Sequence, residues 1–224
     1  MSTAWIIVDD TDPRIQYSGS EWAIDQDVAQ KNLQSYSGDV YNNTLHSSAV
    51  NGTTFLFRFN GISYSFQPSH KGTNFFIGTS GIALYGTVLG GDITEAFGQC
   101  FLDGNAMEVD FGLGPGSGPV NNNQILCLTT PNNGYSEPGE HELQVNITFA
   151  TPALPFLFDF LIYESLPDAP LDGDVLQMGN SFYDFTETQD PHFSFGPGWQ
   201  NIYNQAKTTS IPGSSVTIKF NGDN

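Results

Sequence analysis

Short runs of alternating or continuously apolar residues follow one another along the chain, separated by polar segments. Residues 53–59 form a strongly aromatic strand, and residues 141–149 alternate cleanly between apolar and polar positions. Residues 156–163 are apolar at nearly every position, which predicts a central strand buried on both faces. Further strands are expected in these segments: residues 5–8, 15–22, 82–88 and the two stretches around Cys100 and Cys127. About eight strands are what a two-sheet jelly roll requires. Residues 23–43 are polar and irregular and predict a long loop.

The beginning and the end of the chain carry variants of one pattern. Residues 12–22 and 190–199 both start with Asp-Pro and end with Trp, and residues 47–61 and 208–222 align without a gap. We therefore expect a complete jelly-roll domain at residues 1–165 and a partial second copy at 175–224. The acidic, proline-containing segment 166–174 is the expected linker. We expect the partial copy to be partly ordered, packed on the first domain, or swapped into a neighbouring molecule.

The charge balance excludes two classes of partner. Only six residues are Lys or Arg, and the formal net charge is −18. A nucleic-acid-binding protein needs clustered basic residues to neutralise phosphates, so that function is not expected. Anionic membrane surfaces are disfavoured for the same reason. No run of about 20 apolar residues occurs, so no segment of this chain is expected to span a bilayer.

Two cysteines and three sequons favour an extracellular or cell-surface location. Cys100 and Cys127 both lie in strand-like segments, and a hairpin between them would bring the two sulfurs close enough to bridge. Two buried free thiols are the alternative. Glycosylation acceptors of the Asn-x-Ser/Thr type are Asn42, Asn51 and Asn146.

The chain resembles a family of uncharacterised extracellular or membrane-anchored proteins of mushroom-type fungi, built from tandem galactose-binding-like jelly-roll domains. These segments carry the resemblance: residues 8–15, 17–20, Trp22, 81–86, Cys100, 103–104, 123–127, 139–143 and 158–163. It covers residues 5–163 with one interruption, and 183–222 more faintly. The resemblance implies the fold and an extracellular or membrane-anchored setting, but no function. Residues 62–77 interrupt two strands that are nearly continuous in such proteins, so we expect either an added loop or translated non-coding sequence there. The second copy also stops just past Asn221 and Gly222.

An acidic turn near the N-terminus is the candidate metal site. Asp9, Asp10 and Asp12 offer the hard oxygen ligands that Ca²⁺ prefers. Galactose-binding-like domains commonly hold a structural calcium, so the resemblance points the same way. A solvated turn with aspartate capping is the alternative.

Loop aromatic and amide side chains are the candidate glycan site. One set contains Tyr36, Tyr41, Asn42 and Asn43, and a second set contains the following residues: Asn121, Asn122, Asn123, Asn132, Asn133 and Tyr135. Tyrosine and asparagine suit hydroxyl-rich ligands, although both are ordinary loop residues. Trp22 and Trp199 recur at the same place in the two copies and fit either a core or a sugar-stacking role.

No catalytic motif stands out. The sequence lacks a Gly-x-Ser-x-Gly elbow, a His-Glu-x-x-His motif and a phosphate loop. Asp159 is the one acid inside an apolar strand, and we expect it to be hydrogen-bonded structurally rather than to act as an acid with a raised pKa. The sequence therefore predicts a non-catalytic recognition module for a glycan or cell-wall polysaccharide. The alternatives are a structural or adhesive domain that binds a protein partner through the incomplete second copy, and a carbohydrate-active hydrolase.

Overall fold

A computed structural model describes most of the strands of this chain. The described residues are 5–19, 21–35, 38–61, 81–89, 98–107, 120–129, 138–148, 150, 154–166, 169–170, 174–177, 193–202 and 206–218. Residues 62–77, for which an added loop or translated non-coding sequence was expected, lie outside them. The chain divides into two compact units, of which the first ends at Gln177.

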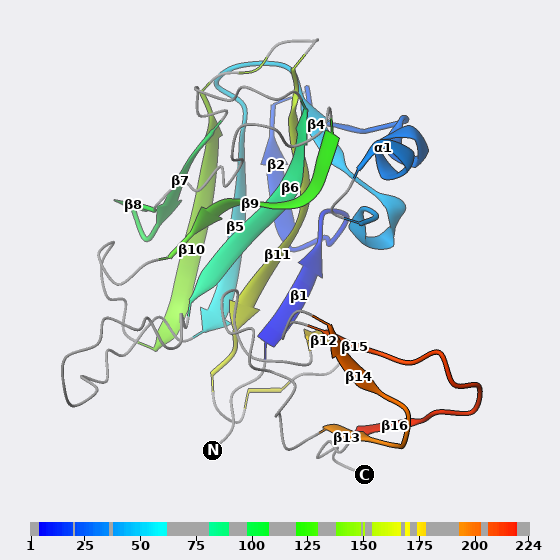
Figure 1. Ribbon diagram of the computed structural model, residues 1–224. Helices are drawn as coiled ribbons and strands as arrows, with labels where there is room; N and C mark the ends of the chain where they lie inside the picture. The colour runs from blue at the N-terminus through cyan, green and yellow to red at the C-terminus, as the bar shows by residue number, and fades with distance from the viewer. Residues whose placement is uncertain are drawn as a thin grey trace, which may run out of the picture. The chain divides into compact units, whose positions relative to one another are not determined.

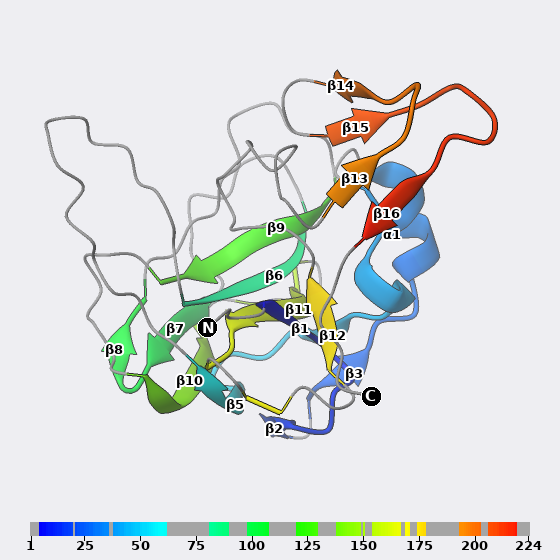
Figure 2. The ribbon, with the colours of Figure 1, turned by 90° about the horizontal axis from the view of Figure 1, so that it is seen from below.

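The first unit consists of two antiparallel sheets. Sheet A contains these strands: β12 (Val175–Gln177), β1 (Trp5–Asp9), β11 (Phe156–Glu164), β4 (His46–Ser48), β3 (Ala23–Ile24), β6 (Ile82–Leu89) and β9 (Val120–Leu128). Sheet B contains these strands: β2 (Ile15–Ser18), β5 (Thr54–Gly61), β10 (Gly139–Ile147), β7 (Gly98–Leu102) and β8 (Asn105–Ala106). Figure 2 shows the two sheets as two layers. The prediction of an all-β sandwich is confirmed.

One hydrophobic core fills the space between the sheets. The alternation in β5 turns Phe55 and Phe57 inward, where they are 0% and 1% exposed. Leu143 and Val145 of β10 are fully buried beside them. A strand that alternates in this way buries one face and leaves the other to solvent, which is why the sequence pattern predicted these two strands correctly.

Strand β11 is central, as its sequence predicts, but its pairing is interrupted. One edge pairs with β6, and the other edge pairs first with β4 and then with β1 (Figure 1). The register with β6 shifts between Phe158 and Phe160. Phe158 and Leu161 both belong to the core, so the inward positions change from even to odd numbers across this bulge.

The predicted disulfide between Cys100 and Cys127 is present. The expectation of a hairpin between the two cysteine strands is wrong. Cys100 lies in β7 of sheet B and Cys127 in β9 of sheet A, so the bond joins the two layers rather than neighbouring strands. Their Cα atoms are 6.3 Å apart.

The loop expected at residues 23–43 contains a helix, α1 (Val28–Gln34), and a short 3₁₀ turn, η1 (Tyr41–Asn43). The helix buries Val28 and the stem of Lys31, whose Nζ atom lies 2.8 Å from Asp25. The short apolar face of α1 explains why periodicity did not reveal it. Within the described residues, no helix combines the length and the hydropathy needed to cross a membrane.

In its described residues, the second unit contains four short strands. They are β13 (Phe193–Phe195), β14 (Gln200–Ile202), β15 (Ala206–Thr208) and β16 (Val216–Ile218). The start of the second copy, expected at residue 175, does not coincide with the boundary between the compact units. Strand β12 pairs with β1 and belongs to sheet A of the first unit.

Candidate functional site

The change of partners along β11 gathers acidic side chains around Asp159. The pairing with β4 ends where His46 faces Phe158, and the pairing with β1 ends where Asp9 faces Phe160. Asp159 lies between these two points, and its carbonyl oxygen accepts the N–H of Asp10 at 2.8 Å. Residues far apart in the sequence therefore meet at one break in the sheet.

Asp10 is fully buried, and its carboxylate is held by two side chains. Thr44 Oγ1 donates to it at 2.6 Å, and His46 Nδ1 lies 2.8 Å from its other oxygen. The ring of Tyr17 stacks on His46 with ring centroids 4.2 Å apart. Tyr17 also donates its hydroxyl proton to the carbonyl oxygen of Asp10 at 2.6 Å. A buried carboxylate is tolerated because its oxygens are paired in this way.

Asp159 is also fully buried, and its carboxylate accepts the backbone N–H of Tyr41 at 3.1 and 3.2 Å. Burial raises its pKa to about 8, and the negative charges of Asp10 and Asp9 act in the same direction, while the Tyr41 N–H opposes them. The expected structural hydrogen bond is thus present, but the pKa is raised as well, which the sequence analysis did not favour.

The pKa values of Asp9 and Asp12 shift in opposite directions although both residues lie in one turn. Burial raises the pKa of Asp9, and a hydrogen bond from the Thr11 hydroxyl opposes the rise. Burial also acts to raise the pKa of Asp12, but the hydrogen bonds and the charge of Arg14 outweigh it and lower that pKa. The Arg14 guanidinium lies 2.8 Å from Asp12 and 3.1 Å from Asp174.

This arrangement does not fit a calcium ion bound by the three predicted ligands. Asp12 faces Arg14, and Asp10 is occupied by Thr44 and His46. Within the described ranges, no group of three or more His, Cys, Asp or Glu side chains is placed to hold a metal. The acidic turn is held by protein donors instead.

Three aromatic side chains, here called the aromatic row, lie beside this cluster, two on sheet A and one on η1. The ring centroids of Tyr41 and Phe160 are 5.5 Å apart, and those of Phe160 and Tyr85 are 4.6 Å apart, with the latter pair stacked. Phe160 and Tyr85 face each other across β11 and β6. All three side chains are half-buried. The exposed Asn42 hydrogen-bonds the carboxylate of Asp9, which places an amide and an acid beside Tyr41.

Only part of the predicted glycan set lies in this region. Tyr41 and Asn42 of the predicted glycan site lie close to Asp9 of the predicted metal site. Members of two sites that were predicted separately therefore come together. Asn121 and Asn122 are not apical-loop residues, because they lie in β9 and are 3% and 0% exposed. Tyr36, Asn132 and Tyr135 lie outside the described residues.

Asn122 has a structural role that explains its burial. Its Oδ1 atom accepts the Thr87 hydroxyl at 2.9 Å, and its Nδ2 atom donates to the carbonyl oxygen of Gly38 at 2.9 Å. Its backbone N–H donates to Ser35 Oγ at 3.0 Å. The amide therefore ties the segment after α1 to β9, and it is not available to a ligand.

Trp22 packs against the core, and its indole N–H donates to the carbonyl oxygen of Thr54 at 3.1 Å. It is therefore a packing residue rather than a sugar platform. Among the sequon residues, Asn42 and Asn51 are exposed, whereas Asn146 is half-buried in β10 and accepts a hydrogen bond from Gln144. Glycosylation at these positions stays a prediction.

A second histidine–acid pair lies in sheet B. His141 Nδ1 is 2.8 Å from Asp103, and the His141 side chain is 4% exposed. Within the described part of the chain, its Nε2 atom is buried without a hydrogen-bond partner. Neither pair could be recognised from the sequence, because the partners stand 36 and 38 positions apart.

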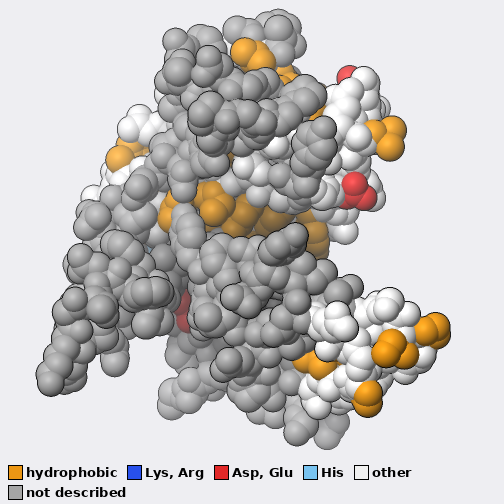
Figure 3. Space-filling view, in the orientation of Figure 1, with side chains coloured by type: hydrophobic (Ala, Val, Ile, Leu, Met, Phe, Trp, Pro, Cys, Tyr) orange, Lys and Arg blue, Asp and Glu red, His pale blue; other side chains and the backbone are white. Residues whose placement is uncertain are grey.

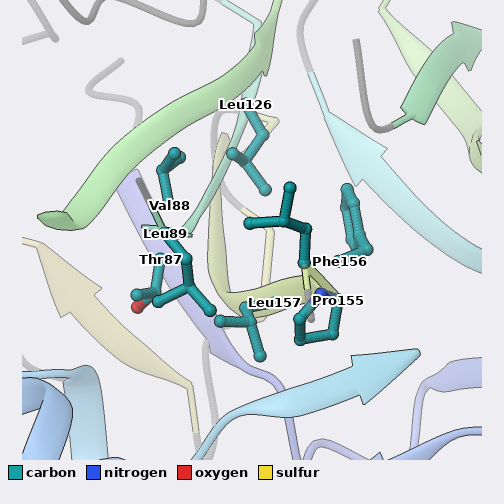
Figure 4. Close-up of a pocket in the computed structure, with 8 residues that line it drawn as sticks. Thr87, Val88, Leu89, Leu126, Pro155, Phe156 and Leu157 are labelled. Atoms are coloured by element: carbon teal, nitrogen blue, oxygen red, sulfur yellow. The ribbon is translucent and has the colours of Figure 1, made fainter. Parts of the chain in front are cut away.

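The described part of the surface carries hydrophobic side chains and a small hollow. Figure 3 shows a band of hydrophobic side chains across the middle of the view. A hollow lined by residues such as Val88, Leu126, Pro155 and Leu157 holds about 10 Å³ (Figure 4). That volume admits about one water molecule, so the hollow is too small for a sugar ring.

Comparisons with known proteins give only distant structural likeness. No family model matches the chain, and no curated protein is similar to it. A family two carbohydrate esterase from Cellvibrio japonicus is similar at a TM-score of 0.40 and 13% identity over 76% of this chain. The Agl-KA catalytic domain is similar at a TM-score of 0.35 and 12% identity over 75% of this chain. The chain spans 37% and 29% of those two structures, and likenesses of this size do not extend to activity.

Proposed function

We propose that this chain is a non-catalytic extracellular recognition module that binds a glycan or cell-wall polysaccharide at the aromatic row. The observation that carries the proposal is the run of contacts from Tyr41 through Phe160 to Tyr85 beside Asn42 and Asp9. Half-buried aromatic faces match the C–H groups of a sugar ring, and nearby amide and carboxylate oxygens match its hydroxyl groups.

The sandwich supports this role by holding the row rigid. Phe160 and Tyr85 stand on paired strands in the interior of sheet A, and Tyr41 is fixed because its backbone N–H donates to the buried carboxylate of Asp159. Aromatic groups fixed in place before binding lose little entropy when a ligand arrives. The disulfide favours an oxidising compartment, as expected of an extracellular module.

Hydrolysis is less well supported by the same geometry. A glycosidase needs two carboxyl groups that flank the scissile bond and contact it. Asp159 has the raised pKa of an acid catalyst, but it is fully buried and its carboxylate faces the N–H of Tyr41. A substrate cannot reach it without unfolding this part of the sheet.

A glycan array with the secreted, glycosylated protein tests the proposal. The Tyr41→Ala variant removes the ring but keeps the N–H that binds Asp159, and we expect affinity for any selected glycan to fall about tenfold, the effect of losing about 1.4 kcal/mol. The Tyr41→Phe variant keeps the ring and should bind within about twofold of the parent protein.

The matched control is Phe101→Ala, because Phe101 is a half-buried aromatic residue on sheet B. It should leave glycan affinity unchanged. Calcium and chelator should also have no effect, because Asp10 and Asp12 are occupied by protein donors. A blank array from demonstrably folded protein, or equal losses in Tyr41→Ala and Phe101→Ala, would reject the aromatic row as the binding site.

A further inference from the structure

Sheet B has an outer face whose side chains differ in kind from those of its buried face. Val145 and Ile147 of β10 are 0% and 1% exposed and belong to the core. Because successive side chains of a strand point to opposite faces, Gln144 and Asn146 of the same strand lie on the outer face. Strand β10 runs inside this layer, with β5 on one side and β7 on the other (Figure 2). The outer face therefore extends across three paired strands.

Asn146 lies on this face between two hydrophilic side chains. Thr54 of β5 is its partner on one side, and Gln99 of β7 is its partner on the other. Gln99 is exposed, and both Thr54 and Asn146 are half-buried. Part of the Asn146 carboxamide is thus in contact with solvent above the sheet.

Two apolar side chains flank Asn146 one step further along the strands. Gln144, two residues before Asn146, faces Leu56 of β5 and Phe101 of β7. Leu56 and Phe101 are therefore diagonal neighbours of Asn146, a relationship that places residues about 7–8 Å apart. Both are half-buried, so part of each apolar side chain also faces solvent. A bulky group joined to Asn146 can reach both of them.

The sequence around Asn146 specifies such a group. Asn146, Ile147 and Thr148 form an Asn-x-Thr acceptor sequence for N-linked glycosylation, and Thr148 is exposed. The Oδ1 atom of Asn146 accepts an N–H of the Gln144 side chain at 2.7 Å. This bond holds the carboxamide by its oxygen, and not by Nδ2, the atom that carries the sugar in a glycosylated asparagine.

We propose that Asn146 carries an N-linked glycan whose first sugar packs on Phe101 and Leu56 and covers the outer face of sheet B. The C–H groups of an N-acetylhexosamine ring match the two apolar side chains, and its hydroxyl and acetamido groups match the amides of Gln99 and Gln144. The proposal rests on the extracellular location in the proposed function. It does not rest on glycan binding at the aromatic row, two members of which lie on sheet A.

The attachment requires a lipid-linked oligosaccharide pyrophosphate as the donor. Asn146 Nδ2 forms a bond to the anomeric carbon of the first sugar, the bond from that carbon to the pyrophosphate oxygen breaks, and the lipid pyrophosphate leaves. Nδ2 loses one of its two protons to a base of the transferase and keeps the other. The amide oxygen is unchanged, so it can still accept the hydrogen bond from Gln144. Transfer to the unfolded chain avoids any obstruction by the neighbouring strands.

Peptide mapping by mass spectrometry tests the attachment, with the full chain secreted from a eukaryotic host. We expect a glycan on the peptide that contains Asn146, and enzymatic release in heavy-oxygen water should add one heavy oxygen at that residue. In the intact glycoprotein, nuclear Overhauser effects should connect ring protons of Phe101 with protons of the first sugar.

Thermal unfolding of paired variants tests the packing. Asn146→Gln and Thr148→Ala remove the acceptor sequence by changing different residues, so an effect that both share reports loss of the glycan. We expect each to lower the melting temperature by about 2–4 °C, and to have clearly less effect when Phe101→Ala is also present. Tyr85→Ala is the matched control, because Tyr85 is a half-buried aromatic residue on sheet A. In that background, loss of the glycan should have its full effect.

Three outcomes would overturn the proposal. The first is an unmodified Asn146 in secreted, folded protein, whether or not Asn42 or Asn51 carries a glycan. The second is an equal effect of glycan loss in the Phe101→Ala and Tyr85→Ala backgrounds. The third is a loss of stability in Asn146→Gln that is absent in Thr148→Ala, which would trace the effect to the amide. A blank glycan array, by contrast, would reject the aromatic row and would not bear on Asn146.

Discussion

Asp10 donates its backbone N–H to the carbonyl oxygen of Asp159 at the point where β11 exchanges one strand partner for another. This bond links the end of β1 to the middle of the central strand. Because the Asp159 side chain is fully buried at this break and its pKa is raised, the break in pairing also affects how the stability of the protein responds to pH.

The Asp159→Asn substitution should reduce the pH dependence of stability. The pKa of Asp159 is raised to about 8 in the folded protein. The folded state therefore binds more protons than the unfolded state between about pH 4 and pH 8, and the free energy of unfolding falls as pH rises through this window. Asparagine keeps an acceptor for the Tyr41 N–H but does not titrate.

Urea unfolding at pH 5 and pH 8 measures the effect. We expect the parent protein to lose on the order of a few kcal/mol between these values, and the variant to lose clearly less. The raised pKa of Asp9 acts in the same direction and should remain in the variant. Identical pH profiles of the two proteins would contradict the role of Asp159.

Removal of Asp10 should be much more costly than removal of Asp12, although both lie in one turn. Asp10→Ala leaves the hydroxyl of Thr44 and the ring N–H of His46 without their buried acceptor, a loss of about 3 kcal/mol. Asp12→Ala removes a pair with the largely exposed Arg14, worth about 1 kcal/mol or less. Chemical denaturation of the two variants gives the comparison, and equal losses would argue against the buried pairing of Asp10.

Reduction of the disulfide should destabilise the first unit without changing its strands. The bond closes a loop with a sequence separation of 27, for which the chain-entropy estimate is about 3.5 kcal/mol. We expect the Cys100→Ala, Cys127→Ala double variant and the reduced parent protein to melt at similar, lower temperatures. If a reducing agent also lowered the melting temperature of the double variant, the effect would have another cause.

Gly86→Ala should destabilise sheet A by about 1–3 kcal/mol through overpacking. An added Cβ atom at Gly86 would lie 2.1 Å from the carbonyl oxygen of Leu157 and 2.6 Å from Leu126, so the strands must separate. Gly104→Ala is the comparison, since its Cβ would meet nothing within 4 Å and only its φ of +77° is unfavourable. Thermal unfolding should show the larger loss of stability for Gly86→Ala. The reverse order would contradict the close approach of Gly86 to Leu157 and Leu126.

Alternation and continuous hydrophobicity were enough to predict β5, β10 and the central position of β11, because one buried face or two buried faces leave a regular trace in the sequence. The bulge at Asp159 was not predicted, since a run of residues that are nearly all apolar does not show which of them face inward. The asparagines at the start of β9 read as a loop because their burial depends on partners such as Thr87 and Gly38, which are distant in sequence.

The candidate site was predicted only in fragments. Tyr41, Asn42 and Asp9 were named, but in two unrelated sets, and nothing in their spacing showed that they would meet. Phe160 and Tyr85 read as ordinary strand residues. Their stacking follows from a register between β6 and β11 that is shifted at the bulge, which only the three-dimensional structure supplies.

The pairing of β13 with β16 and of β14 with β15 repeats the registers of β2 with β5 and of β3 with β4 in the aligned residues, and this bears on the order in which the first unit folds. Because the second unit reaches the same registers in the described strands without a β10 counterpart on β16, the information for them lies within the segment itself. Contacts between nearby residues close short loops and form fast, whereas the pairing of Trp5 with Glu164 must close nearly the whole unit. We therefore expect the β2–β5 segment to pair early in folding, and the union of β1 with β11, which also assembles the acidic cluster, to be a late step.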